Sequence, residues 1–147
     1  SGLYQSIQAL ETSDAISHFA LIVINIDHFK RLNDTYGHGV GDDVLQAFAK
    51  RVGSRIRQGD ILARWGGEEF IVILRANQLD SAQAFAENLR ATIAATPIVA
   101  NPAITISASL GVALGHAGES FDTLFKRADA ALYRAKVGRN RVVCDEG

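Results

Sequence analysis

The sequence RWGGEEF fills residues 64–70, and apolar, strand-like runs lie on both sides of it. The runs predict two strands joined at Gly66-Gly67, because both glycines can adopt positive φ in a two-residue turn at no steric cost. Alternation along a strand sends Glu68 and Glu69 to opposite faces, so at most one of them faces a given ligand directly. The alternative is an ordinary surface hairpin with solvated acids.

The rest of the chain alternates between helical and strand patterns without internal repeats. Further strands are predicted at Phe19 to Ile26, Ile104 to Val112 and Arg141 to Cys144, and helices within residues 1–17 (from about Gln5), at Val40 to Ile56, from Ser81 to before Pro97, and at Phe121 to Ala135. Hairpins mixed with helices predict an α+β fold, with a largely antiparallel central sheet and helices packed on it.

Composition narrows the class of protein. A chain of 147 residues with 48% hydrophobic and 21% charged residues is typical of one soluble globular domain. A net charge of -1 gives no general reason to expect nucleic acid or an anionic membrane as partner. The single cysteine, Cys144, excludes an internal disulfide and fits a reducing compartment. No apolar run is long enough for a membrane span, no signal peptide is present, and the chain does not begin with methionine, so we expect a piece of a longer protein.

Polar residues end the first strand, where Asn25 and Asp27 share one face and Ile26 points to the other. Polar groups at the tip of a buried strand are costly unless they meet water, a cation or a helix terminus. If this strand lies beside the hairpin, Asn25, Asp27 and Glu68 gather into an oxygen-rich pocket suited to magnesium. The alternative for Asp27 is an N-cap of the next helix, and the two roles are compatible.

Asn33 and Asp42 flank a glycine-rich turn at residues 36–39 that joins two helices. An amide and a carboxylate on opposite sides of such a turn can read guanine, whose ring N–H and exocyclic amine lie next to each other. The structural alternatives are Asn33 at a helix end and Asp42 as the N-cap of a helix that starts near Val44. Lys30 can pair with a phosphate, although a lone lysine is usually solvated.

Four blocks of the sequence together resemble the diguanylate cyclase, or GGDEF, family. The blocks are NIDHFKRLNDTYGHGVGD (25–42), RWGGEEF (64–70) as the GGEEF variant, SLGVA (109–113) and ADAALYRAKVGRN (128–140). The resemblance runs from about Phe19 to Val143. It implies one GGDEF domain over residues 1–147 of a longer signalling protein, with the five-stranded palm-type sheet of nucleotidyl cyclases. It also implies the condensation of two GTP into cyclic di-GMP with release of pyrophosphate.

The resemblance assigns roles by position. Gly66, Gly67, Glu68 and Glu69 form the catalytic signature, and Glu68 would bind magnesium or manganese and is a candidate for activating the 3′-hydroxyl. The Ile26 carbonyl, Asn25 and Asp27 complete the expected metal ligands. Asn33 and Asp42 would recognise guanine, and the terminal phosphates would be held by Lys136, Arg139 and the backbone N–H groups of Phe29 and Lys30.

Residues 57–60 resemble the family's RxxD inhibitory site, which binds the product. Arg57 would grip the O6 and N7 edge of guanine, with Asp60 as its partner. Arg90 on the following helix would assist, and Asn88 is an equal candidate for that helper position. The structural alternative is an exposed pair of charges at a helix end.

Two departures from the family pattern bear on activity. Asn25 stands where the family usually has aspartate, which should weaken magnesium binding, and Lys136 and Arg139 are separated by one residue fewer than usual. Two functions therefore remain open: a working cyclase that acts as a homodimer, and a catalytically weak receptor module for GTP or cyclic di-GMP. A nucleic-acid polymerase is a distant alternative, because no basic track accompanies the site. We expect a cytoplasmic location, with the fragment itself not membrane-embedded, although it can be the cytoplasmic part of a membrane-bound sensor.

Overall fold

The computed structural model describes residues 2–146 of the chain. Its helices are α1 (Gly2–Thr12), the short 3-10 helix η1 (Ala15–His18), α2 (Phe29–Tyr36), α3 (His38–Gly53), α4 (Leu79–Ala95) and α5 (Phe121–Gly138). Its strands are β1 (Phe19–Ile26), β2 (Ile61–Arg64), β3 (Glu69–Arg75), β4 (Val99–Ala100), β5 (Ala103–Ile104), β6 (Ala108–Leu114) and β7 (Val142–Cys144).

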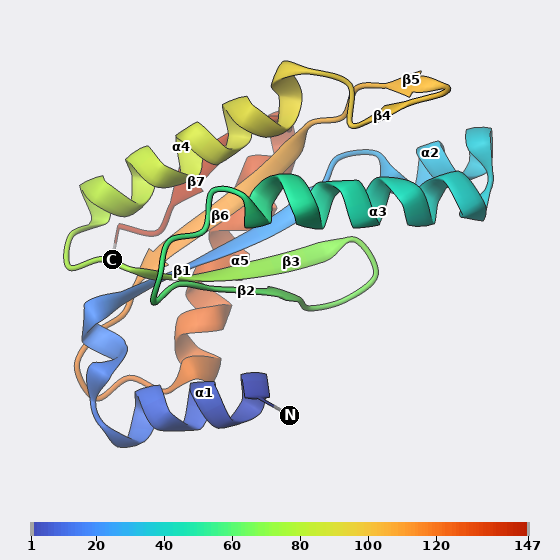
Figure 1. Ribbon diagram of the computed structural model, residues 1–147. Coiled ribbons are helices and arrows are strands. Elements are labelled where there is room, and N and C mark those ends of the chain that lie inside the picture. The colour runs from blue at the N-terminus through green and yellow to red at the C-terminus, as the bar shows by residue number, and fades with distance from the viewer. Residues whose placement is uncertain (1, 147) are drawn as a thin grey trace.

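The fold is α+β, as the sequence predicts, and is built on a five-stranded sheet with the order β2-β3-β1-β6-β7 (Figure 1). The pairs from β2 to β6 are antiparallel, and only β7 runs parallel to its neighbour β6. Strand β1 lies at the centre, and all of its residues are buried. The hairpin of β4 and β5 forms a separate two-stranded sheet that the sequence patterns did not predict. The strand predicted at Ile104 to Val112 therefore starts too early, because Ile104 belongs to β5 and β6 begins at Ala108.

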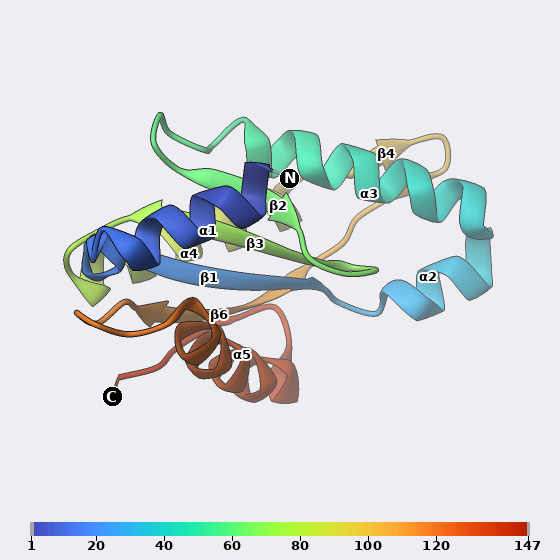
Figure 2. The ribbon, with the colours of Figure 1, turned by 90° about the horizontal axis from the view of Figure 1, so that it is seen from below.

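Helices cover both faces of the sheet, so β1 is apolar on both alternating sides. Ile22 and Ile24 belong to a core cluster with α2, α3 and α4. Leu21 and Val23 belong to a second cluster with α5 and, at its margin, α1. Figure 2 shows α3 and α5 on opposite sides of the sheet. This three-layer arrangement brings the end of β1 between α2 and the end of α5.

The helix predicted within residues 1–17 is shorter than expected, and Ser1 lies outside the described residues. Helix α1 ends at Thr12 because Asp14 adopts a left-handed conformation with φ of 56°, which a right-handed helix cannot include. The Asp14 carboxylate accepts the N–H of Gly118 at 2.9 Å, which fixes this break. Within residues 2–146, none of the helices has the length and apolar character that crossing a membrane requires.

Candidate active site

The tip of β1 lies beside the β2–β3 hairpin, as the sequence analysis required. Asn25 is paired with Glu69 of β3 and with Ser109 of β6. The Ile26 N–H donates to the Glu68 carbonyl at 3.2 Å, which places these two residues side by side. Glu69 lies close to Asp129 and Lys136 of α5. Strand alternation places the Glu69 side chain on the same face of the sheet as Asn25 and the Glu68 side chain on the opposite face. The register is thus consistent with the prediction that the two acids point to opposite faces.

The predicted conformation of the hairpin turn is wrong. Neither Gly66 nor Gly67 has positive φ, and the turn is not a two-residue one. Strand β2 ends at Arg64 and β3 begins at Glu69, so four residues lie between them. The N–H groups of Trp65 and Gly66 both donate to the Glu69 carbonyl, at 2.8 and 3.1 Å. This wider loop does not require the positive φ values of a two-residue turn.

The Arg64 guanidinium braces the loop from inside by donating to the carbonyls of Gly66 and Gly67, at 3.1 Å from Nε to each and at 2.6 Å from Nη2 to Gly67. A Cβ atom built on either glycine would meet nothing within 4 Å. Neither the backbone conformation nor the packing therefore explains the glycines. They leave the loop backbone open to a ligand that approaches closely.

Burial raises the pKa of the Glu69 carboxyl above its ordinary value, and the neighbouring carboxylates of Asp129 and Glu68 raise this pKa further, whereas Lys136 lowers it. This excess of negative charge is an environment that a cation relieves. No group of three or more His, Cys, Asp or Glu side chains in residues 2–146 is placed to hold a metal ion. Asn25 and its cross-strand pair Glu69 share one face of the sheet, so a magnesium site there would combine the Glu69 carboxylate with neutral oxygens, namely the Ile26 carbonyl and the Asn25 amide. The predicted gathering of Asn25 with Glu68 does not follow, because the Glu68 side chain points to the other face.

Asp27 does not have the N-cap role, and its hydrogen bonds argue against the predicted metal role. It does not cap α2, because the N-cap is His28 and that helix has no side-chain cap. Its buried carboxylate accepts hydrogen bonds from the hydroxyl groups of Ser107 and Ser109 and from the N–H of Asn140. Oxygens that already accept three protein donors are poorly suited to a metal ion, so we remove Asp27 from the expected ligands.

Asn33 and Asp42 are brought together by the contact between α2 and α3, which meet at Gly37. A Cβ on Gly41 would overlap the Asn33 side chain, so glycine is needed there for the two helices to approach. Asn33 Oδ1 is buried and has no hydrogen-bond partner within residues 2–146. Helix α3 starts at His38, so Asp42 lies one turn inside it and the N-cap alternative for Asp42 is wrong.

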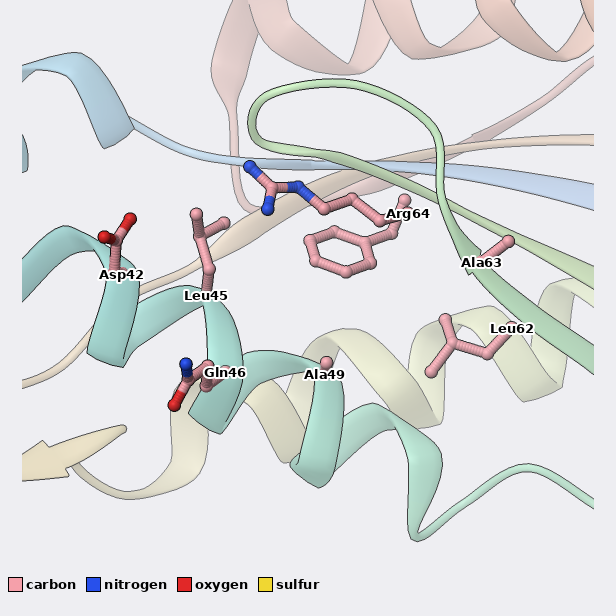
Figure 3. Close-up of a pocket in the computed structure, with 8 residues that line it drawn as sticks. Asp42, Leu45, Gln46, Ala49, Leu62, Ala63 and Arg64 are labelled. Carbon is pink, nitrogen blue, oxygen red and sulfur yellow. The ribbon is translucent and has the colours of Figure 1, made fainter.

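A cavity of about 540 Å³ opens between α3 and the β2–β3 hairpin, and Asp42 is one of the residues that line it. It is lined by Asp42, Leu45, Gln46, Ala49, Leu62, Ala63, Arg64 and Phe70. Figure 3 shows the Arg64 side chain extending toward the end of α3 that carries Asp42. The volume and the mixture of apolar walls with a few polar groups are typical of a site for a small organic ligand.

The predicted phosphate-binding residues lie around the β1 tip, at the end of α5 and at the start of α2. Arg139 Nη1 lies 3.8 Å from Asp27 Oδ1, and Lys136 is near Glu69. Phe29 and Lys30 are the first residues of α2, so their N–H groups lie at a helix start, as predicted. The Lys30 side chain is 90% exposed and pairs with Asp34 at 3.4 Å, which fits the solvated alternative for that side chain.

Comparison with known proteins decides the family. A model of the diguanylate cyclase GGDEF domain matches residues 3–141. The chain belongs to the GGDEF family.

Relatives of this GGDEF domain include the diguanylate cyclase DgcM of Escherichia coli strain K12, which is 48% identical over 126 residues, or 85% of this chain and 30% of DgcM. The chain thus spans less than a third of that relative. Among solved structures, the GGDEF domain of DgcB from Caulobacter crescentus in complex with c-di-GMP has a TM-score of 0.85 at 33% identity, over 96% of this chain and 86% of that one. The active GGEEF domain of a Vibrio cholerae diguanylate cyclase has a TM-score of 0.80 at 37% identity, over 88% and 83%.

The predicted inhibitory pair of this GGDEF domain lies far along the sheet from the β1 tip, where β3 ends. Both oxygens of the Asp60 carboxylate are used: Oδ2 accepts from the N–H and Nε of Arg57, and Oδ1 accepts from the N–H of Arg75. Arg57 Nη2 donates to the Arg75 carbonyl at 2.9 Å, and its guanidinium lies 5.2 Å from the centre of the Phe85 ring. Arg57 and Asp60 therefore form one unit, as the sequence predicts.

Arg90 is not brought to this pair. Its guanidinium donates to Glu87 at 2.6 Å and to Asn140 Oδ1 at 2.9 Å, toward the turn that follows α5. Phe85 contacts Arg57, and Arg90 follows five residues later, on another face of α4. We remove Arg90 from the predicted inhibitory site.

The sequence analysis missed Arg64, Arg75, Ser107 and the local role of Ser109. Arg75 lines a cavity of about 260 Å³ together with Arg57, Gln58 and Asp60. No motif marks Arg75, since it is simply the last residue of β3. The SLGVA block did include Ser109, and the alternation of β6 extended backward would have placed Ser107 on the same face.

Trp65, at the start of the hairpin loop, attaches the loop to α5. Its ring lies 5.9 Å from that of Phe121 and 5.3 Å from that of Phe125, in tilted pairs. Trp65 nevertheless stays 41% exposed. The loop is thus anchored on one side by aromatic packing and open on the other.

Proposed function

We propose that this GGDEF domain condenses two molecules of GTP into cyclic di-GMP and releases pyrophosphate. The proposal rests on the buried, unpaired Oδ1 of Asn33, which packs against Gly41, and on the nucleotide-sized cavity that the adjacent Asp42 lines next to an open glycine loop. An unpaired buried acceptor costs about 1–3 kcal/mol, and a ligand that donates to it recovers this energy. The family membership and relatives named diguanylate cyclases support the same reaction.

Guanine is the base that suits this site. Asn33 Oδ1 is an acceptor, and the Asp42 carboxylate is a second acceptor across the contact of α2 with α3. Guanine presents adjacent donors, its ring N–H and its exocyclic amine, whereas adenine presents an acceptor at the corresponding ring nitrogen. The arrangement therefore favours GTP over ATP.

The triphosphate would extend from the cavity to the tip of β1. There the N–H groups of Phe29 and Lys30 at the start of α2, and the cationic groups of Lys136 and Arg139, are available to phosphate oxygens. Magnesium or manganese would be held by Glu69, the Ile26 carbonyl and Asn25, because Glu69 and Asn25 share one face of the sheet. When bound, it neutralises the triphosphate and stabilises the attacking and leaving oxygens.

Glu68, whose side chain points to the other face of the loop, would accept the proton of the attacking 3′-hydroxyl. Each chain offers the Asn33 and Asp42 arrangement once, so ring closure between two GTP requires two chains face to face. We therefore propose a homodimer as the catalytic unit. Since GTP is an intracellular metabolite, we also propose a cytoplasmic location for this domain.

Product inhibition is part of the proposal. Arg57 is already oriented by Asp60, and Arg75 adds a second cation beside the same cavity. The guanidinium groups of Arg57 and Arg75 outnumber the Asp60 carboxylate, so this cavity carries the net positive charge that an anionic cyclic dinucleotide needs.

Asn25 favours a second candidate function, a receptor module with weak or no catalysis. The amide keeps an oxygen donor but lacks a full negative charge at the metal site, which raises the barrier where charge develops. Such a domain would bind GTP at the Asn33 and Asp42 site, or cyclic di-GMP at Arg57 and Asp60.

The Asn25→Asp variant separates the two candidates. The chain is incubated with GTP and magnesium at a concentration that lets two copies meet, and cyclic di-GMP is measured. We expect a slow wild type and a variant that is at least about tenfold faster, which corresponds to roughly 1.4 kcal/mol of restored transition-state stabilisation. A fast wild type that the substitution leaves unchanged would remove the receptor candidate. A wild type that neither binds GTP nor forms product would refute the cyclase.

A further inference from the structure

The Asp27 carboxylate lies at the centre of a polar cluster at the tip of β1. Its side chain is only 1% exposed. Oδ1 accepts from the Ser109 hydroxyl at 2.6 Å, and Oδ2 accepts from the Ser107 hydroxyl at 2.7 Å. The Asp27 N–H also donates to the Ser107 carbonyl at 2.9 Å. These bonds to β6 and the segment before it fix the carboxylate to the central sheet.

The same carboxylate reaches the turn that follows α5. Oδ2 accepts the backbone N–H of Asn140 at 3.0 Å. Arg139 Nη1 stands 3.8 Å from Oδ1, and the Arg139 side chain is 38% exposed, so its guanidinium is paired and still accessible. Asp27 therefore connects the sheet to the turn that carries the proposed phosphate-binding arginine.

This turn needs such a connection, because its backbone is unfavourable. Arg139 has φ of 60° and Asn140 has φ of 48°, and neither is a glycine. Asparagine tolerates positive φ better than other residues with a Cβ, so the strain lies mainly at Arg139, which keeps this conformation only because its surroundings hold it there. Asp27 holds the turn from the sheet side, and Arg90 holds it from α4 by donating to Asn140 Oδ1.

We propose that Asp27 is a positioning residue that places the Arg139 guanidinium for the terminal phosphates of a nucleoside triphosphate. The inference rests on the proposed function in one respect, that Arg139 contacts those phosphates. With Lys136 and Arg139 only three positions apart, the end of α5 alone does not set the direction of the arginine. The contact with Asp27 sets it, and Arg90 supports the same turn from outside.

A double-mutant cycle in this chain tests the inference. Binding of a non-hydrolysable GTP analogue in the presence of magnesium is measured by calorimetry for wild type, Asp27→Asn, Arg139→Ala and the double variant. We expect each single variant to bind about tenfold more weakly, and the double variant to bind no more weakly than Arg139→Ala. The magnesium concentration for half-maximal analogue binding stays unchanged in Asp27→Asn. Asp122→Asn, on the exposed surface of α5, is the control of equal charge change.

Independent, additive losses in the cycle would overturn the inference, as would a higher magnesium requirement in Asp27→Asn, which a metal ligand would show. A wild type without affinity for the analogue would instead refute the proposed function itself. If Asp27→Asn does not fold, Arg90→Ala takes its place in the cycle. Arg90→Ala should lower the affinity for the GTP analogue about threefold, and this loss should disappear when Arg139 is also alanine. Persistence of the loss in the double variant would contradict the proposal.

Discussion

The two nucleotide sites that we propose differ in whether the chain satisfies their polar groups by itself. At the GTP site, Asn33 Oδ1 is buried without a partner, and Gly66 and Gly67 have no structural reason to be glycine. At the inhibitory site, the Asp60 side chain is 0% exposed and both of its oxygens accept bonds from Arg57 or from Arg75. Unsatisfied groups cost stability until a ligand arrives, whereas satisfied groups stabilise the chain without one. Substitutions at the first site should therefore change function alone, and substitutions at the second should change stability as well.

The largest effect is expected at Glu68. Glu68→Gln should lower cyclic di-GMP synthesis by about a hundredfold or more, because it removes the proposed acceptor of the 3′-hydroxyl proton. The free energy of unfolding should change by less than about 0.5 kcal/mol, since this side chain lies at an open loop. Turnover and chemical denaturation are measured on the same preparation. Retained turnover with an unchanged magnesium requirement would exclude Glu68 from the mechanism.

Asn33→Ala tests the unsatisfied site directly. Affinity for GTP should fall by about ten- to a hundredfold, because a guanine donor loses its acceptor. The free energy of unfolding should stay equal or rise, because the variant no longer buries an unpaired oxygen. Calorimetry with GTP and with ATP, together with denaturant unfolding, gives both quantities. A clear loss of stability would mean that Asn33 is a packing residue, and it would contradict the contrast between an unsatisfied GTP site and a satisfied inhibitory site.

Arg57→Ala should show both effects at once. Cyclic di-GMP should bind at least about tenfold more weakly, as expected for the loss of an arginine contact to guanine. The same substitution should destabilise the chain by about 0.5–1.5 kcal/mol, because Asp60 and the Arg75 carbonyl lose a donor. Titration calorimetry and thermal unfolding without ligand provide the two measurements. Equal cyclic di-GMP affinity in wild type and variant would leave the pair with a structural role only.

The smallest effect is on stability in the absence of metal, where the raised pKa of Glu69 makes the free energy of unfolding depend on pH. A raised pKa means that the folded chain holds the proton of Glu69 more tightly than the unfolded chain does. The protonated carboxyl therefore contributes its full stability below the ordinary pKa of 4.5, and this stability is lost as pH rises through the folded-state pKa. Glu69→Gln should therefore raise Tm by about 1–3 °C at neutral pH. Below the ordinary value the difference should vanish. A Tm difference that is the same at both pH values would contradict this cause.

Sequence patterns predicted those parts of the site whose residues lie close together along the chain. Asn33 and Asp42 lie on adjacent helices around one glycine turn, so their approach follows from chain connectivity. The division of Glu68 from Glu69 follows from strand alternation. The hairpin conformation did not follow from Gly66-Gly67, because the register of β2 on β3 sets the loop length.

The role of Asp27 could not be predicted from its neighbours. Its partners Ser107, Ser109 and Asn140 lie 80, 82 and 113 residues further along the chain. An aspartate before a helix has the same local sequence whether it caps that helix or bonds to a distant strand. Arg90 was misplaced for a related reason, since which partner an arginine on α4 contacts depends on the packing of β7 and the turn before it.

Trp65 is the only tryptophan of the chain. It stands next to Gly66, partly exposed, and against the rings of Phe121 and Phe125. Its fluorescence is therefore an intrinsic optical signal from the loop at the proposed active site, free of background from any other indole. The arrival of a nucleotide can be followed in stopped-flow mixing without attaching a dye, and the rate of loop rearrangement can be separated from the rate of chemistry.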